Sequence, residues 1–161
     1  MKRILLITDS YPPEVRSASH LMQDLAIGLR DREFEVFVLT TYPEYNLAES
    51  YKNIKFPEFL DEDNIKVLRI KTLPHHKVNF IVRGIAQLTM SHLLSAKVKK
   101  YVSKVDVIIV YSPPLPLATL GSKLKKYYGA KFILNVQDIF PQNAIDLGIL
   151  RNKFLIKFFQ R

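Results

Sequence analysis

Residues 1–14 read MKRILLITDSYPPE, and this stretch decides the fold class of the 161-residue chain. The near-continuous apolar run at 3–8 is typical of a strand buried on both faces of a sheet. A sharp proline-containing turn follows, and residues 19–29 then place apolar side chains at helical spacing. We therefore predict a strand–turn–helix unit whose helix begins near Ser17, with Ser17 or Ser19 capping its start.

The rest of the chain alternates between strand and helix patterns in the same way. Further strands are predicted at 35–41, 65–72, 107–111 and 131–136, the last of them buried. Further helices are predicted at 80–102, 116–128, 141–147 and 151–161, and a long loop at 42–64. Strands that alternate with helices need crossover connections. The fold class is therefore α/β, with a largely parallel sheet flanked by helices.

The helix predicted at 80–102 has two possible roles, contact with a membrane or packing on the sheet. Its main apolar stripe is predicted to hold six residues: Ile81, Val82, Ile85, Leu88, His92 and Leu93. Phe80, Met90 and Leu94 then fall off that stripe, and four lysines follow at 97, 99, 100 and 104. Such a helix could lie on an anionic membrane, or it could be an ordinary crossover helix with its lysines in water.

The charge of the chain is strongly asymmetric. Residues 1–63 hold 7 basic and 12 acidic side chains, whereas residues 64–161 hold 17 basic and 3 acidic ones. The second part therefore favours an anionic partner such as phospholipid headgroups, a polyprenyl phosphate or nucleic acid, or else it is a solvated basic surface. Cysteine is absent, which excludes disulfides and cysteine-based metal sites, and His75 and His76 lack metal-site spacing.

Four short motifs carry a resemblance to a known family. They are YPPE at 11–14, SASHL at 17–21, YSPPLP at 111–116 and NVQDIFP at 135–141. Together they resemble the N-terminal domain of a retaining GT-B glycosyltransferase of family 4, the family of WbuB-like and other bacterial surface-polysaccharide enzymes. The chain departs from that pattern where Arg16 to Ser19 replace paired glycines and where Gln137 replaces a histidine.

The resemblance implies one lobe of an enzyme with two Rossmann-like lobes. Residues 1–161 would be the N-terminal, acceptor-side domain, followed in a longer protein by a C-terminal lobe that binds the nucleotide-sugar donor. The donor would be a substrate, with no cofactor and no metal, and this domain alone would be inactive. The acceptor would be a saccharide or a lipid-linked sugar for capsule or O-antigen synthesis, which implies a cytoplasmic protein, peripheral on the inner face of the membrane.

The first group of candidate site residues opens the first helix. Free backbone N–H groups at a helix start can receive a diphosphate, and Arg16 would add positive charge beside Ser17, Ser19 and His20. The structural alternative is that a serine here is only an N-cap, and that His20 is an ordinary surface residue.

The second group follows two later strands. Ser112, Gln137 and Asp138 come directly after strand ends, and ligands of open α/β sheets bind at that edge. Asp138 could orient an acceptor hydroxyl or act as its base, or it could simply cap the next helix. We expect the loops after Thr8, Tyr111 and Val136 to converge on one rim.

Two other functions remain open from the sequence. The chain could be a non-catalytic basic α/β binding module, or the acceptor-recruiting subunit of a split glycosyltransferase. No helix-turn-helix or RNA-binding signature is present, so nucleic acid is not expected as a partner.

Overall fold

The computed structural model describes residues 1–157, apart from 45, 48, 52, 74–79, 140, 141, 149, 153 and 155. In two helices, the side chains of 80, 81, 83–85, 87, 88, 143 and 144 also lie outside the description. The order of the elements is β1 (Arg3–Ile7), α1 (Ser17–Arg30), β2 (Glu35–Thr41), the short 3₁₀ helix η1 (Glu49–Tyr51), β3 (Phe59–Glu62), β4 (Ile65–Ile70), α2 (Phe80–Tyr101), β5 (Val107–Ser112), α3 (Pro116–Tyr128), β6 (Lys131–Val136) and α4 (Gln142–Asp146).

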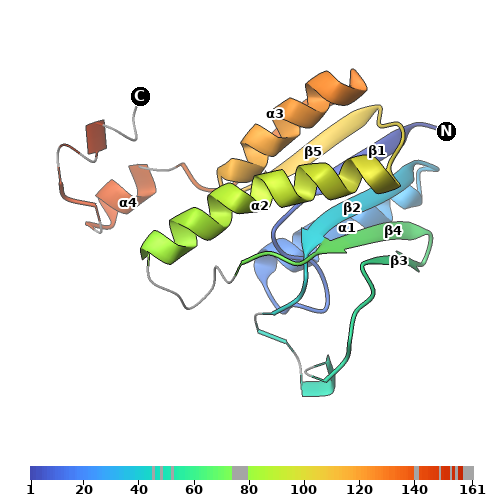
Figure 1. The fold of residues 1–161 in the computed structure, drawn as a ribbon, viewed down its shortest axis with the longest axis horizontal. Coiled ribbons are helices and arrows are strands. Elements are labelled where there is room, and N and C mark those ends of the chain that lie inside the picture. The colour runs from blue at the N-terminus through green and yellow to red at the C-terminus, as the bar shows by residue number, and fades with distance from the viewer. Residues whose placement is uncertain are drawn as a thin grey trace.

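The strands form one six-stranded sheet in the order β3-β4-β2-β1-β5-β6. Five neighbouring strands run parallel, and only β3 pairs antiparallel, with β4. Helices α1, α2 and α3 make the crossovers, as Figure 1 shows. The predicted α/β class with a parallel sheet and flanking helices is confirmed.

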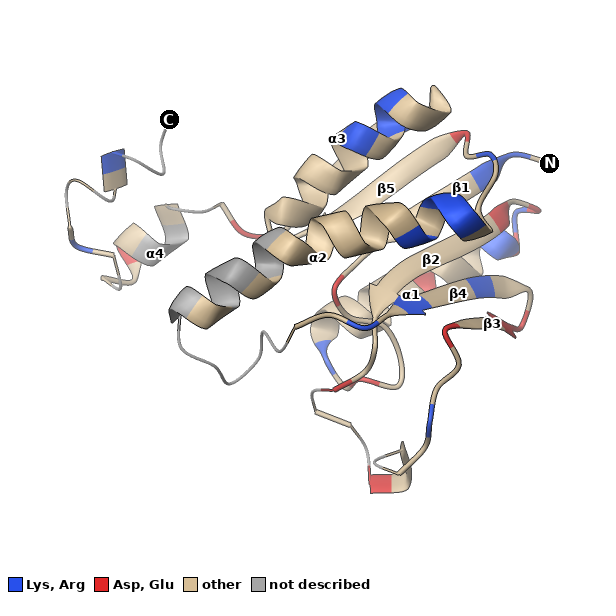
Figure 2. Ribbon diagram, viewed as in Figure 1, with Lys and Arg blue, Asp and Glu red and all other residues tan. Residues whose placement is uncertain are grey.

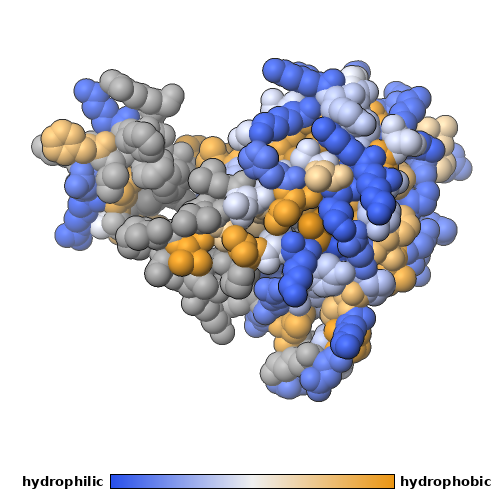
Figure 3. All heavy atoms as spheres, viewed as in Figure 1, coloured by the Kyte–Doolittle hydropathy of each residue, from blue (hydrophilic) through white to orange (hydrophobic). Residues whose placement is uncertain are grey.

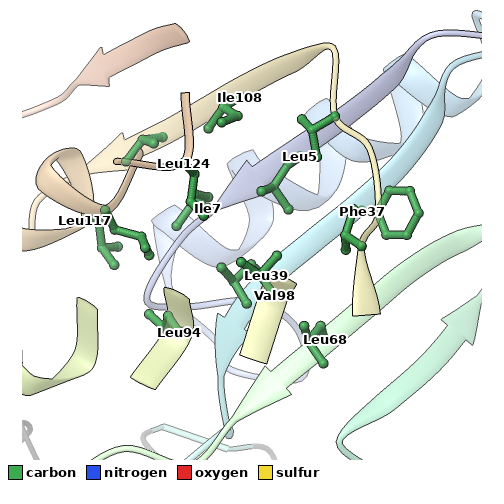
Figure 4. Packing of buried hydrophobic residues seen from close by; sticks show 14 of the residues in the cluster. Leu5, Ile7, Phe37, Leu39, Leu68, Leu94, Val98, Ile108, Leu117 and Leu124 are labelled. Atoms are coloured by element: carbon green, nitrogen blue, oxygen red, sulfur yellow. The ribbon is translucent and has the colours of Figure 1, made fainter. Parts of the chain in front are cut away.

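Helices cover the two faces of the sheet unequally. Alternate residues of each strand point to opposite faces, so Leu5 and Ile7 join one core while Ile4 and Leu6 join the other. On the first face, α2 and α3 pack together over the sheet, and Figure 4 shows their leucines against the strand side chains. On the second face, α1 is the only helix among the described residues that packs over the sheet, against β1, β2 and β4.

The buried side of α2 differs from the predicted stripe. Its core-facing residues recur every four positions and comprise Ala86, Met90, Leu94 and Val98, and Val102 directly after the helix continues the series. Val82, His92 and Leu93, which the prediction placed on the packed stripe, are exposed instead. The prediction failed because both sides of this helix carry apolar residues, and only the tertiary contacts decide between two such sides.

Strand β6 was predicted to be buried, and this prediction was wrong. Ile133, Leu134 and Val136 are exposed, because β6 pairs only with β5 in the described part of the sheet. On the face of α1, no described helix reaches over β6, while α3 covers Phe132 on the other face.

The segment 42–64 was predicted as a long loop, but it also contains strand β3. Asp63 and Asn64 both have positive φ angles, 51° and 64°, between the paired residues Glu62 and Ile65. Two residues in this conformation form the hairpin turn that matches the twist of antiparallel strands. The pair Asp63-Asn64 was the feature of the sequence from which this turn could have been predicted.

Helix ends agree with the sequence at two glycines. Gly129 and Gly148 have φ angles of 65° and 67°, the left-handed conformation predicted for residues that end a helix. The predicted helix at 151–161 falls in part on residues outside the description and stays a prediction. No helix that the structure describes combines the length and the hydropathy needed to cross a bilayer.

Candidate functional site

Three loops lie side by side at the carboxyl edge of the sheet. β5 pairs with β1 on one side and with β6 on the other, and all three strands run parallel. The backbone N–H of Gln137 donates to the carbonyl of Ser112 at 2.9 Å, which ties the second loop to the third. The loops after Thr8, Tyr111 and Val136 therefore share one rim, which we call the carboxyl rim.

Backbone and hydroxyl groups fix the first of these loops. The Thr8 hydroxyl donates to the carbonyl of Ser10 at 2.9 Å and accepts from its N–H at 3.2 Å. The Thr41 hydroxyl, from the end of β2, donates to the carbonyl of Asp9 at 2.9 Å. The loop is therefore held from its own strand and from the neighbouring strand.

Arg16 is the central charge of the first loop. Its Nη1 lies 3.5 Å from an Asp9 carboxylate oxygen and 3.7 Å from a Glu14 oxygen. Asp9 and Glu14 are both buried, whereas Arg16 is half-buried and reaches the surface. The guanidinium is thus oriented by two buried carboxylates and keeps an exposed side at the rim.

The start of α1 differs from the prediction in one respect. Arg16 occupies the N-cap position, and no side chain caps the helix. The expectation that Ser17 or Ser19 would cap it was therefore wrong, since the helix begins at Ser17 itself. The backbone N–H groups of the first helical turn have no acceptor within the helix, which leaves a positive end at the rim.

Charged side chains from the first and the third of these loops act on the phenol of Tyr111. Burial raises its pKa, the negative charges of Asp9 and Asp138 raise it further, and Arg16 lowers it. Asp9, Arg16 and Asp138 therefore all act electrostatically on the phenol at the end of β5. Tyr111 was not among the predicted site residues, although its place before Ser112 was the available signal.

The predicted site residues divide by exposure. Those that reach solvent are Ser17, His20, Gln137 and Asp138, with Arg16 half-buried. Ser19 and Ser112 are buried, and the Ser19 hydroxyl finds no hydrogen-bond partner among the described residues. The Gln137 amide donates to the Asn135 side chain at 2.6 Å, which holds it beside the rim.

Sequence reasoning missed a buried arginine beneath the first loop. Arg69 is 1% exposed; its Nη2 donates to the carbonyl of Pro12 at 3.0 Å, and its Nη1 lies 2.7 Å from Glu62. Its guanidinium also lies 5.4 Å from the centre of the Phe56 ring. Arg69 therefore connects the loop after β1 to the β3–β4 hairpin. A lone arginine in an alternating strand pattern gives no sign of such burial.

A hollow lies at the same edge of the sheet, near the ends of β2 and β4. It encloses about 300 Å³ and is lined in part by Tyr42, Glu58, Lys71 and Lys97. Lys97 Nζ contacts both Glu58 oxygens at 2.8 Å, so these two charges of the lining are paired. Among the described residues, no three His, Cys, Asp or Glu side chains lie close enough to hold a metal ion.

Fold and rim together define a Rossmann-like α/β domain with an open, charged carboxyl edge. No protein-family model matches the chain. Over 158 residues it is 25% identical to a probable glycosyltransferase, WbjE, of Pseudomonas aeruginosa. The match covers 94% of this chain and 35% of that protein, so the chain is a distant relative spanning about a third of its length.

Solved structures share the fold at low sequence identity. The sucrose-phosphate synthase of Thermosynechococcus elongatus matches with a TM-score of 0.61 at 10% identity, over 96% of this chain and 37% of that one. The C-terminal domain of a Pyrococcus furiosus hydrogenase matches with a TM-score of 0.51 at 15% identity, over 83% and 91%. Both likenesses concern the fold alone.

Proposed function

We propose that this chain is the acceptor-side domain of a glycosyltransferase, which moves a sugar from a nucleotide-sugar donor to an acceptor hydroxyl. The observation that carries the proposal is the carboxyl rim, where the parallel strands β1, β5 and β6 end side by side and the charges of Arg16 and Asp138 both act on the Tyr111 phenol. Ligands of open α/β sheets bind at such an edge. The distant relationship to a glycosyltransferase supports the same reading.

Two chemical roles are proposed at the rim. The positive start of α1, with the half-exposed Arg16, would face the diphosphate of the donor. The exposed carboxylate of Asp138 would hold the acceptor hydroxyl and take its proton as the new glycosidic bond forms. The bond from the anomeric carbon to the diphosphate breaks in that transfer, and the leaving diphosphate retains the bonding electrons.

The donor would be held largely by a second lobe opposite the rim. This chain spans about a third of its glycosyltransferase relative, so a lobe of that kind has room elsewhere in a longer protein. We propose that residues 1–161 by themselves transfer no sugar, and that the acceptor is lipid-linked, in surface-polysaccharide synthesis at the inner face of the membrane. The proposed chemistry needs no metal or other cofactor.

The test uses the protein encoded by the complete reading frame. A panel of nucleotide-sugars is offered together with a polyprenyl-diphosphate-linked sugar acceptor, and released nucleoside diphosphate and extended acceptor are both measured. Asp138→Asn and Arg16→Met should each lower turnover at least tenfold. Asp31→Asn, an exposed carboxylate beyond the far end of α1, is the matched control and should leave turnover unchanged.

Sugar transfer by the purified 161-residue chain alone would contradict the proposal that a second lobe is needed to bind the donor. Full turnover in Asp138→Asn would remove that residue from the chemistry. If the reading frame encodes no donor-binding lobe, a split enzyme or a binding module becomes the better explanation. Adding the partner subunit would then distinguish the two, because only the split enzyme would regain transfer.

A further inference from the structure

Lysines gather on the C-terminal parts of α2 and α3 and on the residues that follow them, and we call this surface the two-helix face. Residues 97–131 contain eight lysines, no arginine and one acidic residue, Asp106. Neither α2 nor α3 contains an aspartate or a glutamate. Six of these lysines therefore lie on two neighbouring helices, and Lys104 and Lys131 follow them in the chain.

The lysines of α2 and α3 lie near one another because the two helices run in the same direction. Figure 2 shows the basic residues at the corresponding ends of α2 and α3, at the amino edge of the sheet. Lys99 Nζ of α2 lies 4.2 Å from the centre of the Tyr127 ring of α3, which links the two ends. Except for the half-buried Lys97, the eight lysines are exposed.

The acidic groups nearby are already engaged. Asp106 accepts a hydrogen bond from the backbone N–H of Arg3 at 2.7 Å and lies 3.8 Å from Lys104. Glu58 binds Lys97. The other six lysines have no carboxylate within ion-pair distance among the described residues: Lys99, Lys100, Lys123, Lys125, Lys126 and Lys131.

Apolar and aromatic side chains accompany the lysines on this face. Val82 and Leu93 of α2 are 42% and 43% exposed, Leu93 beside the hollow near the ends of β2 and β4, and Tyr127 of α3 is 58% exposed. Figure 3 views the molecule from this side and shows apolar and hydrophilic side chains both reaching the surface. Lysines near the C-terminal end of a helix also interact favourably with the helix dipole. That effect does not explain the exposed apolar residues, nor does it explain Lys131, which lies in strand β6.

We propose that the two-helix face docks on an anionic lipid bilayer. Lysines on an amphipathic surface are attracted to anionic headgroups, while exposed leucine, valine and tyrosine side chains fit the interface between headgroups and acyl chains. Nucleic-acid surfaces favour arginine, whose planar fork binds phosphate in a bidentate manner. The absence of arginine from residues 97–131 therefore favours the bilayer.

Docking in this way sets the orientation of the domain. α2 follows β4, so it starts near the carboxyl edge and ends at the amino edge of the sheet. A bilayer along its outer side would lie roughly parallel to the sheet and leave the carboxyl rim at the border of the contact. That placement would let a lipid-carried acceptor approach the rim; this consequence rests on the proposed function, whereas bilayer binding does not.

The experiment is vesicle flotation of the 161-residue chain. Vesicles of phosphatidylcholine alone are compared with vesicles containing about one third phosphatidylglycerol. We expect binding to the anionic vesicles only, weakened at least tenfold by 0.5 M salt because salt screens exposed charges. The triple variant Lys99→Glu, Lys100→Glu, Lys126→Glu should lower the partition coefficient at least tenfold.

The matched control carries the same change of charge elsewhere. Arg32→Glu, Lys55→Glu, Lys157→Glu alters three exposed cations outside the two-helix face and should stay within threefold of wild type. Circular dichroism checks that both variants remain folded. Equal loss in both triple variants, equal binding to neutral vesicles, or tighter binding to duplex DNA than to anionic vesicles would overturn the proposal.

The outcome is separable from that of the proposed function. Transfer to a water-soluble acceptor analogue by the complete protein should survive the Lys99, Lys100 and Lys126 substitutions, because these residues lie away from the carboxyl rim. Loss of flotation with retained transfer supports the docking surface alone. Flotation without any transfer supports docking and contradicts the enzymatic function.

Discussion

At the scale of single residues, two glycines in helices meet opposite surroundings. A Cβ added at Gly121 of α3 would lie 2.5 Å from both the Val110 and the Phe132 side chains, which is closer than packed atoms can approach. A Cβ added at Gly28 of α1 would meet its nearest neighbour, the Arg32 guanidinium, at 3.6 Å. Gly121 therefore allows α3 to pack closely on β5 and β6, whereas Gly28 has no such role.

This contrast gives a paired prediction for stability. Gly121→Ala should lower the free energy of unfolding by about 1–3 kcal/mol, since overpacking forces the neighbours to move. Gly28→Ala should raise it by about 0.4–1 kcal/mol, since alanine restricts the unfolded chain and favours the helix. Urea unfolding of the two variants measures both values. Equal effects would show that α3 does not pack on the sheet as described.

A second residue-scale prediction concerns pH. Hydrogen bonds from Lys66 and Arg3, the latter at 2.6 Å, hold the pKa of Glu35 below its usual value. A lowered pKa in the folded state gives stability that is present above the usual value of about 4.3 and is lost as the pH falls through the folded pKa. Glu35→Gln should therefore flatten the fall in stability below about pH 4.5.

Unfolding in urea between pH 3 and pH 7 measures this effect. Glu33→Gln, which removes an exposed carboxylate from the turn before the same strand, is the control and should keep the wild-type acid dependence. If Glu35→Gln lost stability with acid as steeply as wild type, the Glu35 ion pairs would not be formed in solution.

At the scale of elements, the hairpin turn between β3 and β4 can be tested directly. Asn64 has a φ of 64°, a conformation that costs most L residues about 1–2 kcal/mol and costs glycine little. Asn64→Gly should therefore leave stability unchanged or raised, whereas Asn64→Val should lower it by about 1–2 kcal/mol. Thermal unfolding measures both, and equal melting temperatures would contradict the described turn.

The elements also show what sequence patterns can and cannot decide. The pattern located β1, β2, β4, β5 and β6 and the main helices to within a few residues, because buried strands and glycine helix ends leave local signals. It missed β3, whose four residues carry too little periodicity, and it chose the wrong side of α2. The formation of β3 and the buried side of α2 both depend on which other element lies next to them, and the local sequence does not determine those neighbours.

The candidate site shows the same division. Strand order along one sheet edge can be inferred, so the meeting of the loops after β1, β5 and β6 was predictable. The burial of Ser19 and Ser112 was not, nor was the contact of Arg69 with Pro12, since each depends on packing across the sheet. Binding by the predicted site residues stays a prediction until a ligand is tested.

At the scale of the whole molecule, strand β6 leaves an exposed apolar edge of the sheet. Its inner edge pairs with β5, and in the described part of the chain its outer edge has no partner strand. Exposed apolar edge strands pair readily with other chains, and natural proteins often protect such edges with charges. The sequence FILNV at 132–136 contains no charge, so we expect the isolated 161-residue chain to self-associate through this edge.

Ile133→Lys tests this expectation, because residue 133 is 51% exposed on the edge strand. A charge there should suppress concentration-dependent association, measured by sedimentation velocity, and change the free energy of unfolding by no more than about 0.5 kcal/mol. Ile54→Lys makes the same chemical change at a site that is 50% exposed but lies outside the sheet. Added charge alone would reduce association equally in both variants, whereas pairing through the edge predicts that only Ile133→Lys stays monomeric.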